Sequence, residues 1–94
     1  MSDSVKFPLG QTVMTPGVQN LVFSGACNPG EVLARHQSGD WGDLDDEDKQ
    51  MNEEDLVLGE RLLSKYHVGP GRVAIYVITE RDRSVTTLLL PSEY

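Results

Sequence analysis

The sequence predicts an α+β fold in which short helices pack on one face of a small antiparallel sheet. Helix-start signals are confined to the first two thirds of the chain, where a capping residue and a proline occur together twice. The last third is instead rich in Val, Ile, Thr and Tyr, in runs separated by short turns. A chain of 94 residues has the length of one domain, so residues 1–94 are expected to form a single unit around one modest core.

Residues 5–13 are predicted to form an opening strand. Pro8 has no backbone N–H to donate, which favours a place at an edge of the sheet. Gly10 marks a bend or a bulge within this segment. The segment is therefore a candidate fourth strand, beside three strands predicted near the C-terminus.

Two short helices are predicted next, each started by a capping residue followed by proline. Thr15 precedes Pro16, and Asn28 precedes Pro29; in each pair the first side chain is expected to cap the helix, and proline suits the first helical position. Glycine then ends each helix, at residues 25 and 39. The apolar residues expected to face inward are Val18, Leu21 and Val22 in the first helix, and Val32 and Leu33 in the second.

A loop over residues 40–44 leads into a third predicted helix. Asp45 is expected to cap it, and Gly59 to end it. Carboxylates at residues 46–48 suit the positive end of the helix dipole. The expected apolar anchors of this helix are Leu44, Met51 and Leu56.

The last third predicts an antiparallel meander of three strands, over residues 61–68, 72–80 and 84–91. The connections Gly69-Pro70-Gly71 and Arg81-Asp82-Arg83 are short enough for hairpins. We expect the helices to cover one face of this sheet, because a sheet needs a second layer to bury its apolar face.

Negative charge is concentrated between residues 40 and 55. This window holds nine carboxylates and one lysine, a net charge of −8, whereas the whole chain carries −7 and the remaining residues sum to +1. Two or three carboxylates would suffice to start a helix, so the excess predicts a surface for a basic partner. The same charge repels nucleic acid, although it resembles a phosphate backbone in sign. A solvated helix face is the alternative interpretation.

No metal, cofactor or membrane site is expected. An EF-hand loop needs glycine at its sixth position, and the acidic segment does not supply one. Counted from Asp43 the sixth residue is Asp48, and counted from Asp40 it is Asp45. The single cysteine, Cys27, excludes an intrachain disulfide and a four-cysteine zinc site, and is expected to be a packing residue. With no signal-peptide pattern, and no apolar run near the roughly 18 residues of a membrane helix, a cytoplasmic protein is expected.

His36 and His67 raise the question of catalysis. Neither belongs to a metal-binding spacing, and His36 is expected to end the second helix, where a partly positive imidazole is favoured. An enzyme would use His36 with Asp40 or Asp43 as a proton-transfer pair, and Arg83 to hold an anion. No nucleophile stands beside either histidine in the sequence, so this hypothesis ranks below binding.

Two loop features have both a structural and a functional interpretation. Trp41 lies between Asp40 and Gly42, and we expect its ring to fold back into the core; the alternative is an aromatic anchor at the surface. The turn at residues 81–83 carries two arginines. One arginine pairs with the acidic segment as an intramolecular clamp, or the two are simply solvated, or the two bind a phosphate or carboxylate; the first two interpretations are preferred.

Three stretches occur together along the chain: FPLG with the following TPG, ARHQSGDWGDL, and VITERDRSVTTLLLPSEY. In the patterns FPLG…TPG, RHxxGDWG and ITExDRSVTTxLLPxEY, the chain resembles a group of short bacterial proteins often encoded on plasmids and other mobile elements. The resemblance spans nearly the whole chain; it implies one compact unit and no particular activity. The recurrence of the GDWG loop and the DRS turn in the group implies the site candidates Asp40, Trp41, Gly42, Asp43, Asp82 and Arg83.

The function that the sequence favours is binding of a basic protein surface. The candidate contact residues are Asp40, Trp41, Asp43, Glu53, Glu54 and Asp55, with Asp82 and Arg83 as a candidate anion-binding or structural turn. The mobile-element setting implies, by analogy, an inhibitor of a nucleic-acid enzyme or of host defence. The alternatives are an accessory or structural protein whose acidity serves only solubility, and the small enzyme described above.

Overall fold

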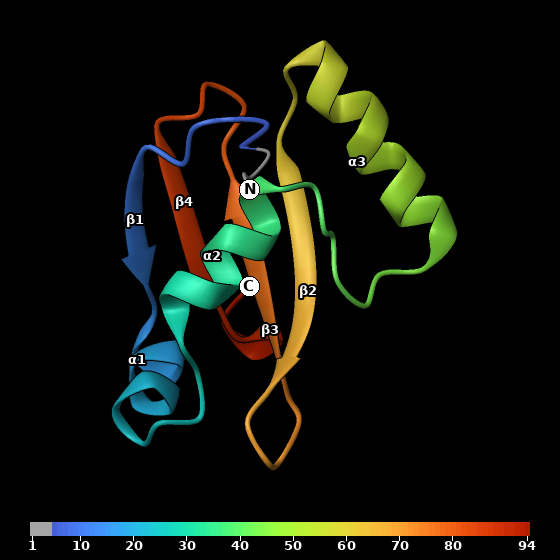
Figure 1. Cartoon of the computed structure of the whole chain (residues 1–94). Coiled ribbons are helices and arrows are strands. Elements are labelled where there is room, and N and C mark those ends of the chain that lie inside the picture. The colour runs from blue at the N-terminus through green and yellow to red at the C-terminus, as the bar shows by residue number, and fades with distance from the viewer. Residues whose placement is uncertain (1–4) are drawn as a thin grey trace.

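The computed structural model describes residues 5–94 and shows three helices packed against a four-stranded sheet (Figure 1). The α+β fold class predicted from the sequence is therefore confirmed. The elements in chain order are β1 (Gln11–Met14), α1 (Pro16–Phe23), α2 (Pro29–Gln37), α3 (Asp46–Leu58), β2 (Leu62–Val68), β3 (Val73–Thr79), β4 (Val85–Leu89) and the 3₁₀ turn η1 (Pro91–Glu93).

The sheet has the strand order β1-β4-β3-β2. Strands β2, β3 and β4 form the predicted antiparallel meander, with Tyr66 opposite Ile75 and Val77 opposite Leu88. The opening segment joins the sheet at its edge as β1, but it starts at Gln11 rather than at residue 5. It runs parallel to β4, so the sheet is mixed. No hairpin connects these two strands, and nothing in their connection imposes an antiparallel pairing.

Two of the three predicted helix caps form. The side chain of Asn28 accepts from Glu31 N, and that of Asp45 accepts from Asp48 N. The expected capping of α1 by the Thr15 hydroxyl is wrong.

The C-terminal turn η1 supplies the missing cap of α1. The Thr15 hydroxyl donates to Glu93 Oε1 at 2.5 Å, and Glu93 Oε2 accepts from Gly17 N at 3.0 Å. A carboxylate suits the positive end of the helix dipole better than a hydroxyl does. The contact ties the first helix to the last residues of the chain.

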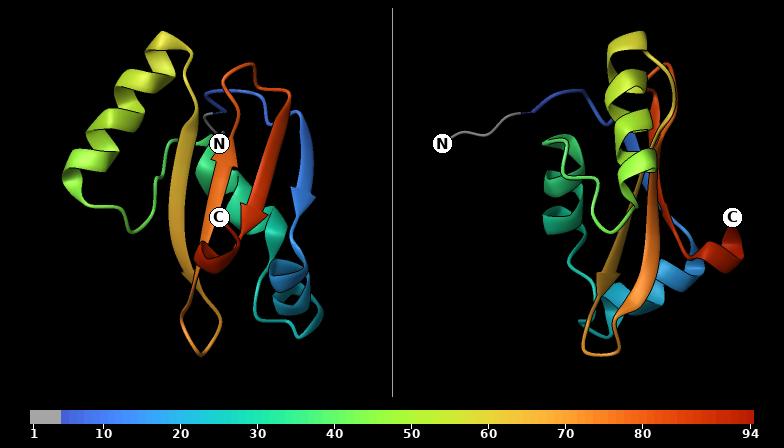
Figure 2. Two further views of the ribbon diagram at one scale, coloured as in Figure 1. Left: turned by 180° about the vertical axis from the view of Figure 1, so that it is seen from behind. Right: turned by 90° about the vertical axis from the view of Figure 1, so that its right-hand side faces the viewer.

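The helices surround the sheet rather than lying together on one face (Figure 2). Helix α2 covers one face, α1 packs where β1 and β4 end, and the C-terminus lies on the side opposite α2. The main core lies between α1, α2 and the sheet. Its buried members are Val18, Cys27, Val32, Tyr66, Ile75, Val77 and Leu88.

Helix α3 stands along the outer edge of β2, which corrects the expectation that all helices cover one face. The buried residue of α3 is Asn52, whose amide bonds to the backbone of Leu63. The expectation that Met51 anchors α3 is wrong. Its side chain is 55% exposed, because the helix turns Asn52 toward the strand instead. The expected anchors Leu44 and Leu56 do pack against a second core cluster, formed by Phe7, Trp41 and Leu62.

Across residues 5–94, none of the helices combines the length and the apolar character needed to cross a membrane.

Candidate functional site

The Trp41 ring lies in the core, as predicted. It is 3% exposed and stacks against Phe7 with ring centroids 6.3 Å apart and an interplanar angle of 16°. Its indole Nε1 donates to Glu53 Oε2 at 2.7 Å, so the ring also joins the 40–44 loop to α3. A ring in this position holds the loop in place, and it does not offer a platform to a partner.

The loop around Trp41 adds a short backbone pairing to the edge of β2. Lys65 N donates to Trp41 O at 3.2 Å, and Asp43 N donates to Lys65 O at 2.6 Å. Between them, Gly42 has φ +78°, and a side chain there would collide with the Lys65 carbonyl and the Tyr66 ring. Only glycine satisfies both conditions.

Asp40 and Asp43 are held by neighbouring basic side chains. Asp40 Oδ2 accepts from Arg35 Nε at 2.7 Å, and this hydrogen bond lowers the pKa of the Asp40 carboxyl. Asp43 Oδ2 lies 2.8 Å from His67 Nδ1, and the hydrogen bond from that ring lowers the pKa of Asp43. Both carboxylates remain about half exposed, at 46% and 50%.

His36 is fully buried and belongs to a row of hydrogen-bonded polar side chains that runs across neighbouring strands of the sheet. Its Nδ1 lies 2.6 Å from Ser64 Oγ, and its Nε2 lies 2.9 Å from Thr79 Oγ1. Thr79 then bonds to Thr86, whose hydroxyl donates to Leu9 O. Burial, together with the charge of Arg83, lowers the pKa of His36 to about 4.

The expectation that the His36 imidazole is partly positive is therefore wrong, because the ring is neutral near pH 7. The hypothetical proton-transfer pair with Asp40 or Asp43 does not form: His36 bonds to Ser64 and Thr79 instead. The side chains of Ser64, His36 and Thr79 bring together a nucleophile and a base, but all three residues have 0% exposure to solvent.

Arg83 is a structural residue of the β3–β4 turn. Its guanidinium donates to the backbone carbonyls of Glu60 at 2.6 Å and Glu80 at 3.1 Å, and lies 5.6 Å from the centre of the Phe7 ring. Asp82 accepts from the backbone and the hydroxyl of Ser84. The clamp on segment 40–55, one of the two interpretations favoured for this turn, is wrong, because both arginines contact residues outside that segment.

Arg81 completes that turn at the surface. It approaches Glu60 at 3.6 Å, outside the acidic segment, and both side chains are substantially exposed. The turn therefore serves the fold through Arg83 and Asp82, and leaves Arg81 weakly held.

The carboxylates of α3 and its cap differ sharply in what they contact. Asp45 caps the helix and Glu53 binds the Trp41 indole. Within residues 5–94, the other carboxylates of the helix have no side-chain hydrogen bond or ion pair. These five residues, here called the unpaired carboxylates, are Asp46, Glu47, Asp48, Glu54 and Asp55.

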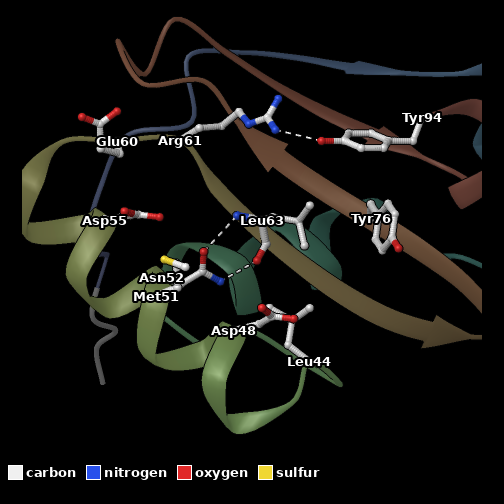
Figure 3. A pocket seen from close by; sticks show the side chains of 10 residues that line it. All are labelled: Leu44, Asp48, Met51, Asn52, Asp55, Glu60, Arg61, Leu63, Tyr76 and Tyr94. Atoms are coloured by element: carbon white, nitrogen blue, oxygen red, sulfur yellow. Dashed lines mark hydrogen bonds between the residues drawn. The ribbon is translucent and has the colours of Figure 1, made fainter.

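The unpaired carboxylates face two directions. Glu47 and Glu54 are two helical turns apart on the outer surface of α3, both exposed. Asp48 and Asp55, also two turns apart, face a cleft between α3 and the sheet (Figure 3). The consecutive residues Glu53, Glu54 and Asp55, grouped as one contact patch in the sequence, thus differ: Glu53 bonds to the Trp41 indole while it stays exposed, Glu54 faces the solvent, and Asp55 faces the cleft.

The cleft has a volume of about 610 Å³, and its strand residues lie on the sheet face opposite the main core under α2. Leu63 and Tyr76 belong to this face because they alternate with Ser64, Tyr66, Ile75 and Val77, which point to the other side. The lining residues are Leu44, Asp48, Met51, Asn52, Asp55, Glu60, Arg61, Leu63, Tyr76 and Tyr94.

Sequence reasoning missed most of this cleft. The spacing of Asp48, Asn52 and Asp55, at i, i+4 and i+7, was a usable signal that these residues share one helix face. Nothing local indicated that Arg61, Tyr76 and Tyr94 would meet that face, because strand pairing and the C-terminal turn bring them there.

In the described part of the chain, no group of three or more His, Cys, Asp or Glu side chains is placed to hold a metal ion. Comparisons with protein-family models, with curated proteins and with solved structures found no match to this chain.

Proposed function

We propose that this protein is a binding module that engages a basic protein surface through α3. The observation that supports it most directly is the set of five unpaired carboxylates on one helix at the edge of the fold. Folding uses Asp45 and Glu53, and it uses some of the charge in the first turn for the helix dipole. It does not use Glu54 or Asp55, which lie in the last two turns.

Charge at the C-terminal half of a helix has an energetic cost. Carboxylates there face the negative end of the dipole, and like charges on one helix repel each other. The last turn of α3 contains no basic residue that would offset this. A binding surface explains the cost, because clustered charge speeds the approach of an oppositely charged partner.

A basic groove that normally holds nucleic acid is the partner surface that we favour. Helix α3 is about 20 Å long and carries the five unpaired carboxylates on more than one face, so the charge on any one face is sparser than the roughly one charge per 1.7 Å of a duplex. The likeness to a nucleic-acid backbone is therefore one of sign and not of spacing. The resemblance to mobile-element proteins supports the same class of partner, as an inhibitor.

The test uses a matched pair of double variants. Glu47→Gln with Glu54→Gln neutralises the outer surface of α3 without touching Trp41 or the cleft. Glu31→Gln with Glu80→Gln removes the same charge elsewhere. Each protein is used as bait in the source cell, and association rates with a purified, captured protein are then measured at several salt concentrations.

The proposal expects the α3 variant to associate about tenfold more slowly, with a weaker salt dependence, because steering is lost. The control variant should associate at the wild-type rate. Equal rates for both variants, or rates that do not change with salt, would contradict the proposal.

A further inference from the structure

The cleft between α3 and the open sheet face has the composition of a site for one basic side chain. We propose that it receives a single arginine or lysine side chain of the partner, as an anchor beneath the acidic helix. The inference rests on the proposed function, and specifies what the partner inserts and where.

The α3 wall of the cleft carries two carboxylates, about 10 Å apart along the helix, so a cation that contacts one of them is also attracted by the other at longer range. Asp48 and Asp55 lie on the same helix face and, among residues 5–94, neither has an ion-pair partner. Asp55 is only half-exposed, so a contact with it is less screened than one at the outer surface of the helix. With Glu60 and Arg61, the ionisable residues of the lining sum to −2, which favours a cation over an anion.

The floor and opposite wall suit the aliphatic stem of a basic side chain. Leu63 and Tyr76 form an apolar floor on the strands, and Met51, 55% exposed, lines the cleft from α3 (Figure 3). Long basic side chains place their methylene groups on such surfaces while the charged end reaches a polar group. Covering Met51 would remove one of the larger exposed apolar side chains of the protein from water.

An internal contact shows how the aromatic wall accommodates a guanidinium. Arg61 lies 5.9 Å from the centre of the Tyr94 ring and donates to the Tyr94 hydroxyl at 2.8 Å. Tyr94 in turn meets Tyr76 edge to face, with centroids 5.8 Å apart at 80°. Aromatic faces attract cations, and the Tyr76 ring lies on the cleft side of this pair (Figure 3).

The volume fits this occupant class. At about 610 Å³ the cleft falls within the roughly 300–1,000 Å³ of small-ligand pockets. It has room for one extended side chain and part of the backbone that carries it. A helix or strand of the partner would not fit inside and would have to lie over its opening.

Capped peptides that carry one arginine among glycine and serine provide the direct probe. Matched peptides replace the arginine with lysine or with citrulline, which has a similar shape but no charge. Binding to ¹⁵N-labelled protein is followed by NMR, through the backbone amides of Asn52, Leu63 and Tyr76.

The arginine and lysine peptides should shift these amides, and the citrulline peptide should not. Asp48→Asn with Asp55→Asn should weaken the arginine peptide about tenfold, since a charge-assisted contact of roughly 1.4 kcal/mol is lost. Glu47→Gln with Glu54→Gln, which loses the same charge outside the cleft, should weaken it less than threefold. Unchanged amide spectra of the free variants establish that both remain folded; otherwise Asp55→Asn alone replaces the pair.

Three results would overturn the cleft assignment: no shift with the arginine peptide, equal shifts with citrulline, or shifts confined to the outer surface of α3. The last of these leaves the proposed function standing, because the acidic helix would still bind the cation. The proposed function fails separately, if the association rate of a captured partner does not change when Glu47 and Glu54 are neutralised.

Discussion

Asn52 and Leu63 form a closed pair at the edge of the sheet. The Asn52 side chain donates from Nδ2 to Leu63 O at 2.5 Å, and its Oδ1 accepts from Leu63 N at 3.2 Å. One amide group thus satisfies both outward backbone groups of Leu63, as a neighbouring strand would. Together with the pairing of the Trp41 loop on Lys65, it fixes α3 beside β2 and thereby creates the cleft.

Replacing Asn52 should detach α3 from the sheet edge. Asn52→Ala leaves the Leu63 N–H and carbonyl without their partner, and we expect it to lower the free energy of unfolding by about 2 kcal/mol. Asn52→Asp keeps the size but places a carboxylate against the Leu63 carbonyl, so it should cost at least as much at pH 7. Urea unfolding measures both, and wild-type midpoints for the two variants would contradict the bridging role.

Trp41 is expected to be the most sensitive residue of the 40–44 loop. Trp41→Ala should cost about 3–5 kcal/mol, because it removes a large buried ring. Trp41→Phe should cost less, since it keeps an aromatic ring near Phe7, although it loses the hydrogen bond to Glu53 and part of the buried ring volume. Thermal unfolding checks the order; an unchanged melting temperature for Trp41→Ala would show that the ring does not hold the loop.

Local signals in the sequence predicted the elements well. Asn28 and Asp45 cap their helices through their own side chains, and glycines follow the ends of the helices, so these boundaries depend on residues a few positions apart. The change to β-branched residues after residue 60 likewise marks the meander, whose strands are neighbours in sequence.

Long-range contacts explain what the sequence did not predict. Glu93 reaches Thr15 across the whole chain, and the parallel pairing of β1 with β4 depends on the path taken between them. The position of α3 depends on Asn52, whose polar side chain looks like a surface residue until the free edge of β2 is known. The candidate site was predicted in part: the acidic helix was identified, but the separate directions of its carboxylates and the cleft below them were not.

The burial of His36 predicts loss of stability in mild acid. The unfolded chain takes up a proton near the ordinary imidazole pKa of about 6.5, whereas the folded protein does so only near 4. Stability from this group is therefore complete above pH 6.5 and is lost as the pH falls toward 4. The loss should be about 3 kcal/mol.

The comparison is made with His36→Gln, which cannot titrate. Urea unfolding of both proteins is measured between pH 7 and pH 4, and the difference between their curves isolates His36, because His67 and every carboxylate are present in both. A difference that stays constant over this range would mean that the pKa of His36 is the same in the folded and unfolded states, so that burial does not lower it.

Glu93 should stabilise α1 from the far end of the chain. Glu93→Ala removes the acceptor of Gly17 N and of the Thr15 hydroxyl, and we expect it to destabilise α1, as the loss of an N-cap does. Amide exchange should quicken in the first turn of α1 more than in α2. Ser92→Ala is the neighbouring control; equal exchange in the two variants would show that α1 is held by its apolar face alone.

Two adjacent glutamates of α3 should respond in opposite ways to the same substitution. Glu53→Gln weakens the acceptor of the buried Trp41 N–H and should lower the free energy of unfolding by about 1–2 kcal/mol. Glu54→Gln removes an exposed, unpaired charge and should change it by less than about 0.5 kcal/mol, or raise it slightly.

A double-mutant cycle separates the contact of Glu53 from its charge. In a Trp41→Phe background the indole donor is absent, so Glu53→Gln should lose most of its effect, whereas Glu54→Gln should behave as in the wild type. Urea unfolding of the six proteins provides the measurement. If Glu53→Gln destabilised both backgrounds equally, the carboxylate would stabilise the fold through the helix rather than through its contact with Trp41.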